Sequence, residues 1–499
     1  MEAMMRTFSV YDVFVRNDKI FGDCIALFDG KHTITYNQLH NLVIRAATVL
    51  QDHGVEKGDR VAFLCMNRME FFILVGAAAK LGAILVPLNW RLSQHELRYI
   101  VNDSSPTVFF TDHVHLERAT ELAEQCSVSL AQMEMLFAGG TPRTSDIEVS
   151  PQVDMMDGET PLCIIYTAAV DGYPRGAVLS HSNIIAANLQ IITSMGLAGS
   201  DVNLTMLPLF HITGVNLALA VMQAGGKNII IDKFDEFKTL QLTASEKVTV
   251  WGSFPPILSR IIEQLEKGEY DIRSLKYIVG LDGPETISRM EKISTAKFWI
   301  LYGQSETSGF VTFGEASAKS GSAGKQGCLT TYCLVDEEDK KVEDGMVGEI
   351  VVRGPLVFQG YWNQQELNAR TFRNGWHHTG DLGQTDAEGY LYFKGRKPEK
   401  ELIKPGGENV YPAEVESVIL DHESVKAVCV IGVPDPRFGE GIKAVCVLEK
   451  NCQLGKEDLI EFVGGRIARY KKPQYVEFVD ELPANEGVID RSKVKELWG

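Results

Sequence analysis

The sequence predicts an α/β protein with a large N-terminal domain and a small α+β domain at the C-terminus. Segments typical of strands and of helices alternate from the start of the chain to about residue 350. Many of the strand-like segments are short apolar runs, which is typical of parallel strands covered by helices on both faces. At 499 residues the chain is also too long for one ordinary core, so at least two domains are expected.

The first part of the chain predicts helices and strands in alternation. Apolar residues at helical spacing or in short runs give, in order, a helix at 36–54, a strand at 60–65, a helix at 70–81 and a strand at 83–87. The most apolar stretch, 71–88, is interrupted by Lys80 and two glycines and ends at Pro87. It is therefore predicted as helix, turn and buried strand rather than as a membrane span.

Apolar runs typical of buried strands continue in the second part. They are 162–165, 204–208, 227–231, 277–280 and 298–302. From residue 347 the strands become shorter and turns more frequent, which predicts a β-rich subdomain. A charged segment with proline and glycine, 395–409, is interpreted as a linker. The roughly 100 residues beyond it are enough for a small domain, with strands at 425–433, 441–448 and 475–479 and a helix at 459–468.

Charge and cysteine usage exclude several classes of function. The net charge of −17 argues against nucleic acid or an anionic membrane as a main partner. The first residues lack the apolar core of a signal peptide, and the nine cysteines are scattered singly. Cys328 and Cys333, the closest pair, have no histidine at ligand spacing, so neither a zinc site nor a disulfide framework is expected. A cytoplasmic protein without integral membrane association is predicted, and a homodimer stays open.

The stretch Tyr166–Gly176 is the expected centre of the functional site. It follows the strand 162–165 and precedes the segment 182–189, which is predicted to be helical. A glycine-bearing turn between a strand and a helix can cradle a phosphate, because backbone N–H groups and a helix N-terminus converge there. The loop is poor, however, in the small hydroxyl residues that usually assist such a cradle.

Five stretches resemble known motifs when they are taken together and in order. They are 166–176, 208–214, 302–307, 379–381 and 404–416. Together they resemble the adenylate-forming superfamily of acyl-CoA synthetases, luciferases and peptide-synthetase adenylation domains, and fatty or aromatic acyl-CoA ligases in particular. No Walker A loop or Rossmann glycine fingerprint is present. The resemblance spans essentially the whole chain and implies an N-terminal domain at 1–396, a hinge at 397–404 and a C-terminal domain at 405–499 that rotates.

The resemblance implies a ligase that joins a carboxylic acid to CoA in two steps. The acid attacks the α-phosphorus of ATP, which gives an acyl-adenylate and pyrophosphate. The thiol of CoA then attacks the adenylate carbonyl and releases AMP. The implied ligands are a small carboxylic acid, ATP or AMP, Mg²⁺ and CoA. Two alternatives stay open: a non-catalytic homologue that binds acyl groups, AMP or CoA, and an enzyme that uses the adenylate in a different second step.

The resemblance also implies roles for individual residues. Glu306 would bind Mg²⁺ as a hard oxygen ligand, His211 would lie beside the acyl pocket, and Lys404 would hold a phosphate or carboxylate. The implied nucleotide-binding residues are Thr167, Gly172, Arg175, Tyr302, Gly303, Gln304, Thr307, Asp381 and Arg396. The implied CoA-binding residues are Gly406, Gly407 and Glu408. Trp251 and Phe254 favour an apolar acid as the substrate.

Two departures from the family pattern fall where the outer phosphates of ATP are handled. In the loop 166–176, the residues from Ala168 to Asp171 replace the usual serine, glycine and threonines, and Arg175 replaces a lysine. Near the C-terminus, Val488 stands where relatives carry a lysine that neutralises charge during adenylation. Valine can neither carry a charge nor donate a hydrogen bond. The sequence therefore predicts that adenylation from ATP is impaired and that thioester formation is preserved.

Overall fold

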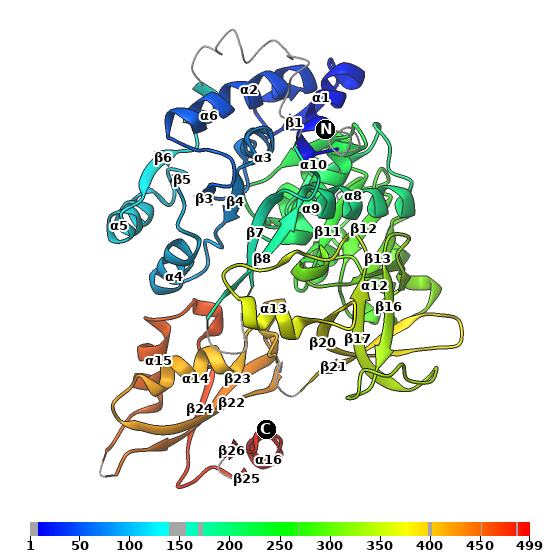
Figure 1. Cartoon of the computed structure of the whole chain (residues 1–499). Coiled ribbons are helices and arrows are strands. Elements are labelled where there is room, and N and C mark those ends of the chain that lie inside the picture. Colours follow the sequence, from blue (N-terminus) through cyan, green and yellow to red (C-terminus); the bar gives the residue numbers. More distant parts are fainter. Residues whose placement is uncertain are drawn as a thin grey trace. The chain divides into compact units, whose positions relative to one another are not determined.

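The structure is a computed structural model that describes residues 8–138, 156–167, 173–268, 270–397, 402–450, 452–485 and 488–499. The chain divides into two compact units. The first unit comprises Met1–Leu88, Val101–Ile165 and Gly176–Lys394, and the second comprises Asn89–Ile100, Tyr166–Arg175 and Gly395–Gly499. Figure 1 shows the whole chain coloured along the sequence. Part of the predicted hinge, 398–401, lies outside the described residues.

Two large sheets built mainly from parallel strands form the body of the first unit. The nine-stranded sheet has the order β15 (Lys325–Gln326), β14 (Thr312–Glu315), β13 (Lys297–Tyr302), β12 (Tyr277–Gly280), β11 (Val250–Ser253), β9 (Val202–Thr205), β10 (Lys227–Ile230), β1 (Ile25–Phe28) and β2 (Thr33–Thr35). The seven-stranded sheet has the order β18 (Gly360–Tyr361), β8 (Arg175–Ser180), β7 (Pro161–Thr167), β4 (Ile84–Pro87), β3 (Arg60–Leu64), β5 (Val108–Thr111) and β6 (Ser129–Gln132). The predicted α/β class is confirmed.

A smaller sheet forms the β-rich part of the first unit, as predicted from residue 347 onward. Its strands are β16 (Thr331–Val335), β17 (Val347–Arg353), β20 (Trp376–Thr385) and β19 (Phe372–Arg373) in that order, and β21 (Leu391–Arg396) also pairs with β20. Its neighbouring strands are antiparallel where their register is resolved. This sheet carries one of the two halves of the candidate site described below.

The helices follow the apolar periodicity of the sequence closely. They are α1 (Val10–Phe21), α2 (Tyr36–Asp52), α3 (Glu70–Leu81), α4 (Gln94–Ser104), α5 (Leu116–Cys126), α6 (Met135–Ala138), α8 (His181–Met195), α9 (Ile212–Gln223), α10 (Glu236–Glu246), α11 (Ile257–Leu265), α12 (Pro284–Ile293) and α13 (Gln365–Thr371). Helix α3 has the predicted bounds, because Gly82 ends it in the left-handed conformation with φ of 71°. In the part of the chain that the structure describes, every helix is too short or too polar to cross a bilayer.

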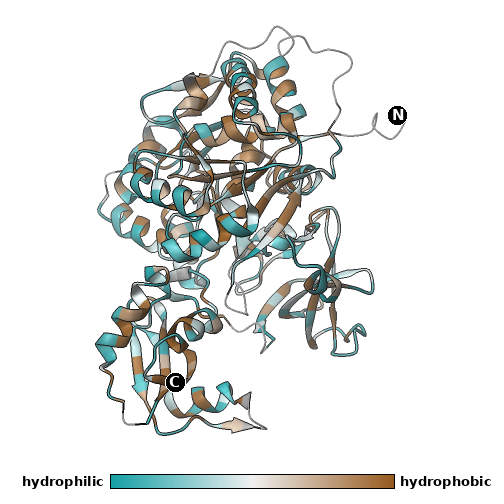
Figure 2. Ribbon diagram, turned by 60° about the vertical axis from the view of Figure 1, so that its left-hand side comes forward, coloured by the Kyte–Doolittle hydropathy of each residue, from teal (hydrophilic) through white to brown (hydrophobic). Residues whose placement is uncertain are grey.

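The core of the first unit is built where α1, α2 and α3 pack together and against the sheets (Figure 1). Tyr36, Phe72 and Phe110 are among its largest fully buried side chains. Figure 2, coloured by hydropathy, shows apolar strands (brown) inside and polar faces (teal) on the outer helices. Burial of these side chains removes apolar surface from water, which is the main force that stabilises such a core.

The second unit contains the small α+β fold predicted after the linker. Its sheet has the order β22 (Val425–Asp435), β23 (Gly439–Leu448) and β24 (Tyr475–Phe478), and its helices are α14 (Pro412–Leu420), α15 (Lys456–Gly464) and α16 (Arg491–Trp498). A short hairpin pairs β25 (Ala484–Asn485) with β26 (Val488–Ile489). Helix α15 was predicted at 459–468 but begins three residues earlier and ends at Gly464, because a second glycine follows and favours a helix end.

The prediction that the loop 166–176 leads from a strand into a helix is wrong. Strand β8 follows the loop directly, and β7 and β8 are neighbours in the seven-stranded sheet. Helix α8 begins only at His181, after its N-cap residue Ser180. The loop therefore joins two adjacent strands, and the helix N-terminus that was expected to help bind a phosphate is not part of it.

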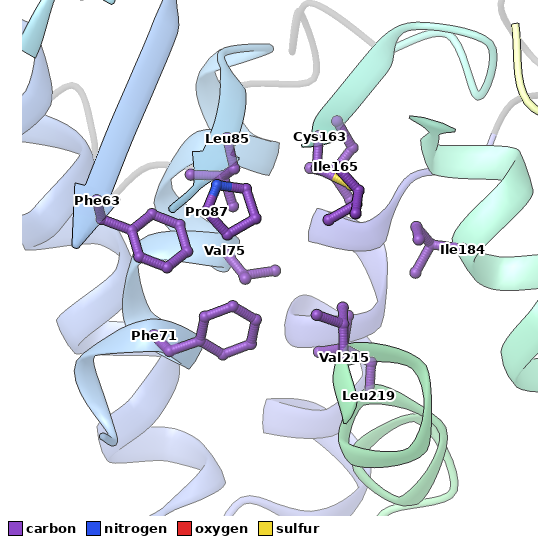
Figure 3. A pocket seen from close by; sticks show the side chains of 11 residues that line it. Phe63, Phe71, Val75, Leu85, Pro87, Cys163, Ile165, Ile184, Val215 and Leu219 are labelled. Carbon is purple, nitrogen blue, oxygen red and sulfur yellow. The ribbon is translucent and has the colours of Figure 1, made fainter. Parts of the chain in front are cut away.

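A small apolar cavity of about 20 Å³ lies in the core of the first unit (Figure 3). It is lined by Phe63, Phe71, Val75, Leu85, Pro87, Leu162, Cys163, Ile165, Ile184, Val215 and Leu219. Binding sites for drug-sized molecules span about 300 Å³ or more, so this space cannot hold the acid substrate. Burial raises the pKa of the Cys163 thiol to about 12, which keeps it protonated and unreactive. The cavity is a packing defect.

Val75→Ile is expected to stabilise the protein by filling this cavity. Val75 is 1% exposed and its side chain points into the space (Figure 3). One added methylene should raise the free energy of unfolding by about 0.5–1 kcal/mol. Val61→Ile is the matched control, because Val61 is fully buried on β3 but does not line the cavity. It should destabilise by about 1–3 kcal/mol through overpacking. Urea titration measures both, and equal signs would contradict the prediction.

Candidate active site

The nine-stranded sheet supplies the first half of the candidate site at the end of β13. Tyr302 ends this strand and is 7% exposed. The next residue, Gly303, is in close contact with the backbone of Gly309, since a Cβ atom at this position would lie 2.3 Å from the carbonyl carbon and oxygen of Gly309. Only glycine fits there. The chain can thus turn sharply after β13 and place Gln304 and the following residues beside the β-rich sheet.

Asp381 on β20 receives two hydrogen bonds from this turn. The hydroxyl of Tyr302 donates to Oδ2 of Asp381 at 2.9 Å, and the amide Nε2 of Gln304 donates to the same oxygen at 2.6 Å. Nε2 of Gln304 also donates to the carbonyl oxygen of Thr379 at 3.0 Å. Asp381 is 1% exposed. The structure therefore brings together three of the predicted nucleotide-binding residues, which lie on different sheets and up to 79 positions apart.

Asp381 reaches this position because β20 contains a bulge. His378 is paired with Val351 of β17, whereas Leu382 is paired with Glu349, so three residues of β20 oppose the single residue Ile350. Gly380, in the middle of the bulge, has φ of 68°, which favours glycine. A bulge bends its strand and redirects side chains, and such bulges are frequent beside active sites.

Glu306 lies in the short 3₁₀ helix η2 (Ser305–Thr307) that follows the turn. Its side chain is 8% exposed, and its Oε1 accepts a hydrogen bond of 2.7 Å from the hydroxyl of Tyr361 on β18. Its backbone carbonyl accepts from the amide of Phe358 at 2.9 Å. Within the described ranges, no lysine or arginine forms an ion pair with Glu306. Carboxylate oxygens are hard ligands, so a carboxylate oriented by a neutral donor is suited to a hard cation.

Thr307 is fully buried and its hydroxyl is engaged within the turn. The amide of Gln304 donates to Oγ1 of Thr307 at 2.9 Å, and Oγ1 donates to the carbonyl of Gln304 at 3.2 Å. These bonds close the 304–307 turn on which Glu306 is carried. In this structure the Thr307 hydroxyl therefore forms its hydrogen bonds to the backbone of the turn itself.

His211 occupies the N-cap position of α9 and is exposed. Its ring lies 4.6 Å, centroid to centroid, from the ring of Phe210. Trp251, one of the two residues that suggested an apolar acid, is fully buried in the core between β9, β12 and the helices that cover them. Phe254 is half-buried. His211 and Phe254 are therefore the accessible members of the predicted acyl-pocket set.

The predicted phosphate residues Thr167 and Arg175 belong to the second unit. They lie at the facing ends of β7 and β8, where Oγ1 of Thr167 donates to the carbonyl of Arg175 at 3.4 Å. Gly172 and the substituted residues from Ala168 to Asp171 lie outside the described residues.

Arg396 and the predicted CoA segment also belong to the second unit. Nη1 of Arg396 donates to the hydroxyl of Tyr411 at 2.9 Å. Lys404 is exposed, and its backbone amide donates to Glu440 at 2.8 Å. Gly406 and Gly407 form the 3₁₀ turn η5 (Pro405–Gly407).

Glu408, predicted to bind CoA, forms an ion pair with Arg91. Burial raises the pKa of the Glu408 carboxyl, and the positive charges of Arg91 and Lys471 oppose this rise only in part. Binding of CoA through Glu408 would have to compete with Arg91.

Comparison with known families decides which class of enzyme this geometry belongs to. The family model of AMP-binding enzymes matches residues 14–362, and the model of the AMP-binding enzyme C-terminal domain matches residues 414–486. The chain is an AMP-binding enzyme.

Similar proteins specify the type of AMP-binding enzyme. The chain is 34% identical over 476 residues to an indoleacetate–CoA ligase of Aromatoleum aromaticum, and 33% identical over 473 residues to a long-chain-fatty-acid–CoA ligase of Mycobacterium tuberculosis, each covering 93% of both chains. Its structure resembles a double mutant of o-succinylbenzoate CoA synthetase from Bacillus subtilis bound with its product analogue, with a TM-score of 0.88, 28% identity and 98% of each chain covered.

These findings confirm the adenylate-forming family and the ligase class predicted from the motifs. This AMP-binding enzyme joins a carboxylic acid to CoA through an acyl-adenylate, and it uses ATP, Mg²⁺ and CoA. The non-catalytic alternative is not favoured. Among the described residues no group of three or more His, Cys, Asp and Glu could form a metal cage. Mg²⁺ in nucleotide enzymes needs only one or two carboxylate ligands besides phosphate and water. The oriented carboxylate of Glu306 is therefore compatible with a Mg²⁺ site.

In this AMP-binding enzyme, two residues in or behind the site of the first unit have no role predicted from the motifs: Tyr361 orients Glu306, and Glu349 contacts the bulge that carries Asp381. In the second unit the same is true of Tyr411, which binds Arg396. Each has an ordinary sequence environment. Only the adjacent aromatic pair Tyr361–Trp362 after a glycine could have drawn attention to the first of them.

Proposed function

We propose that this enzyme activates an apolar carboxylic acid, with Asp381 binding the ribose of the nucleotide and Glu306 binding Mg²⁺. The observation that carries the proposal is the buried contact of Tyr302 and Gln304 with Asp381 beside the turn that holds Glu306. A carboxylate held by two donors has a defined orientation, and a charged acceptor makes strong hydrogen bonds to sugar hydroxyls. The second carboxylate, 8% exposed, is oriented by Tyr361 and supports a metal role.

The substrate class is supported by the relatives and by the residues around the site. Two of the relatives act on indoleacetate and on long-chain fatty acids, which are acids with a large apolar body. Phe210 packs against His211, with ring centroids 4.6 Å apart, so the predicted pocket residue has an apolar aromatic neighbour. We therefore propose an aromatic or long-chain carboxylic acid in place of a short one.

A panel of acids tests this proposal directly. The enzyme is incubated with ATP, Mg²⁺, CoA and indoleacetate, ferulate, palmitate, acetate or malonate, and acyl-CoA and AMP are quantified by mass spectrometry. Turnover of at least one of the first three acids, and at least tenfold less with acetate and malonate, is the expected result. Preference for acetate or malonate would contradict the proposed class. Product without AMP would contradict the nucleotide chemistry.

We further propose that adenylation is the slower of the two half-reactions. The support is the sequence of the two segments that face the outer phosphates in relatives: Val488 on β26 replaces a lysine, and Arg175 replaces a lysine beside an altered loop. A positive charge that meets developing negative charge is worth on the order of 10²–10³ in rate in comparable sites.

Val488→Lys is therefore expected to accelerate ATP–pyrophosphate exchange by about tenfold or more. Val488→Met is the matched control, since it adds length without charge. Thiolysis of synthetic acyl-AMP by CoA should change less than about twofold in both variants, because this step does not involve pyrophosphate. The proposal would be overturned if the wild-type rate of ATP–pyrophosphate exchange already exceeded its rate of thiolysis and Val488→Lys did not increase the exchange rate.

A cytoplasmic location and a homodimer are also proposed. All nine cysteines are free thiols, as expected in a reducing compartment. Light scattering after size exclusion measures the assembly state, and a monomeric mass at working concentration would reject the homodimer.

A further inference from the structure

Glu349 on β17 is a buried carboxylate for which the reaction as described so far gives no role. It is 3% exposed. Its Oε1 accepts a hydrogen bond of 2.9 Å from the backbone amide of Gly380. Its Oε2 lies 3.1 Å from Nδ1 of His378 and 3.6 Å from Nη2 of Arg373. A buried carboxylate is costly unless it is paired and hydrogen-bonded, and all three partners here meet that need.

The contact to Gly380 lies in the bulge that presents Asp381. Because the bulge interrupts the β17–β20 ladder between Glu349 and Val351, the amide of Gly380 has no place in that ladder. A buried amide needs an acceptor, and the Glu349 side chain provides one. On the other side of Gly380, Oγ1 of Thr379 donates to the carbonyl of Ile350 at 2.6 Å. Two side-chain bonds thus hold both flanks of the bulge.

A second layer of contacts holds the Glu349 carboxylate in place. Arg373 on β19 donates to Asp339 through Nε at 2.9 Å and through Nη2 at 3.0 Å. Asn374 donates to the same carboxylate at 2.9 Å. This two-point pair fixes the guanidinium whose Nη2 also lies beside Glu349. The position of Glu349 is therefore set by residues from β19, β20 and the turn after β16.

The effect of the bulge on Asp381 is geometric. The bonds of Asp381 to Gln304 and Tyr302 are 2.6 Å and 2.9 Å, so a shift of about 1 Å in the bulge would break at least one of them. Displacements of this size away from the reacting atoms can cost on the order of a hundredfold in rate.

We propose that Glu349 is a positioning residue for nucleotide recognition: it holds the Gly380 amide, and through the bulge it sets the carboxylate of Asp381 against the ribose. The proposal rests on the proposed ribose role of Asp381. It assigns Glu349 no contact with substrate. The hydrogen bond to the Gly380 amide requires that Oε1 lies at the right distance. The negative charge of the carboxylate is needed only for its contacts with His378 and Arg373.

Two substitutions separate reach from charge. Glu349→Gln keeps an oxygen at the same distance and loses the charge, whereas Glu349→Asp keeps the charge and is one methylene too short. The readout is the preference for ATP over 2′-deoxyATP, measured as a ratio of kcat/KM values, because a carboxylate that binds the ribose hydroxyls distinguishes the two nucleotides. Loss of one hydrogen bond to a charged group changes such a ratio by about tenfold or more.

We expect Glu349→Asp to lower this preference by about tenfold, and Glu349→Gln to keep it within about twofold of the wild-type value. In Glu349→Asp the KM for the acid and the KM for CoA should change less than the KM for ATP. In Glu349→Gln all three constants should stay close to the wild-type values. Glu338→Gln, an exposed glutamate of the same subdomain paired with Lys340, is the control and should behave as the wild type. General destabilisation would lower the yield and melting temperature but would not alter the choice between the two nucleotides.

Asp381→Asn separates failure of this inference from failure of the proposed function. A preference that survives in Asp381→Asn shows that Asp381 does not read the ribose, and the proposed function fails. If Asp381→Asn loses the preference while Glu349→Asp keeps it, the inference about Glu349 alone is overturned. Calorimetry with AMP and with 2′-deoxyAMP compares the same two sugars through their dissociation constants. Because it needs no turnover, it still decides the question if a variant is too slow to assay.

Discussion

Glu306→Gln is expected to slow formation of the acyl-adenylate by about a hundredfold or more. Glutamine has nearly the same shape and can still accept the 2.7 Å hydrogen bond from Tyr361, so the turn should be retained. What it lacks is the negative charge that makes a carboxylate a strong ligand for Mg²⁺. The loss should appear in ATP–pyrophosphate exchange, and a higher Mg²⁺ concentration should restore part of it.

The second half-reaction is the internal control for this variant. Thiolysis of synthetic acyl-AMP requires no Mg²⁺–pyrophosphate complex and should fall less than about tenfold if electrostatic support of ATP is the role of Glu306. Glu315→Gln is the matched control, since Glu315 lies on β14 of the same unit and its side chain is 42% exposed. Exchange at the wild-type rate in Glu306→Gln, or an equal loss in both half-reactions, would contradict the assignment.

Lys471→Met is expected to cause the largest loss of stability, about 3–5 kcal/mol in the free energy of unfolding. Lys471 lies in the second unit, in the 3₁₀ turn η6 (Arg469–Lys471), with 3% of its side chain exposed. Its Nζ is 2.6 Å from Oε1 of Glu96 and 2.8 Å from Oε2 of Glu414, both nearly buried. Methionine has a similar volume, so the loss would come from two buried carboxylates left without their cation.

The control replaces all three residues of the buried charge cluster, Lys471, Glu96 and Glu414, by neutral ones. Because removing one partner is costly while replacing all partners is often tolerated, Glu96→Gln and Glu414→Gln added to Lys471→Met should recover more than half of the loss. Lys472→Met, the neighbouring lysine with no ion pair among the described residues, should cost less than about 0.5 kcal/mol. Urea denaturation followed by circular dichroism measures each variant. A loss below about 1 kcal/mol in Lys471→Met would show that the cluster does not stabilise the unit.

The pH dependence of this difference has a defined sign. Burial lowers the pKa of Lys471, but the negative charges of Glu414 and Glu96 outweigh burial, and the net pKa stands above its ordinary value. A raised folded-state pKa means that the stabilisation is complete below the unfolded value of about 10.4 and is lost as the pH rises above it. The gap in the free energy of unfolding between wild type and Lys471→Met should therefore narrow in alkaline solution above about pH 10.

Local patterns in the sequence were sufficient for many of the elements. The helix 70–81 was predicted at its observed bounds, because an apolar periodic segment is followed by Gly82. The strand predicted at 277–280 matches β12, a short apolar run between turns. The loop 166–176 was misjudged because β8 (Arg175–Ser180) contains only a short apolar run, 177–179, which local periodicity does not identify as a strand. Whether such a run pairs or coils depends on its neighbour β7, which local periodicity cannot show.

The sequence by itself determined the fold class, the family and the identity of the polar residues that gather at the site, since these depend on residue type and order along the chain. The tertiary structure alone decided which of them touch. Tyr302 and Asp381 meet because two different sheets bring their strands together, and Asp381 points at its partners because a bulge in β20 redirects it. Glu349 has no local signal, and Tyr361 has only its place in an aromatic pair, because the importance of each lies in the atom that it faces across the fold. Such contacts arise from packing between distant segments, and packing is a property of the folded chain.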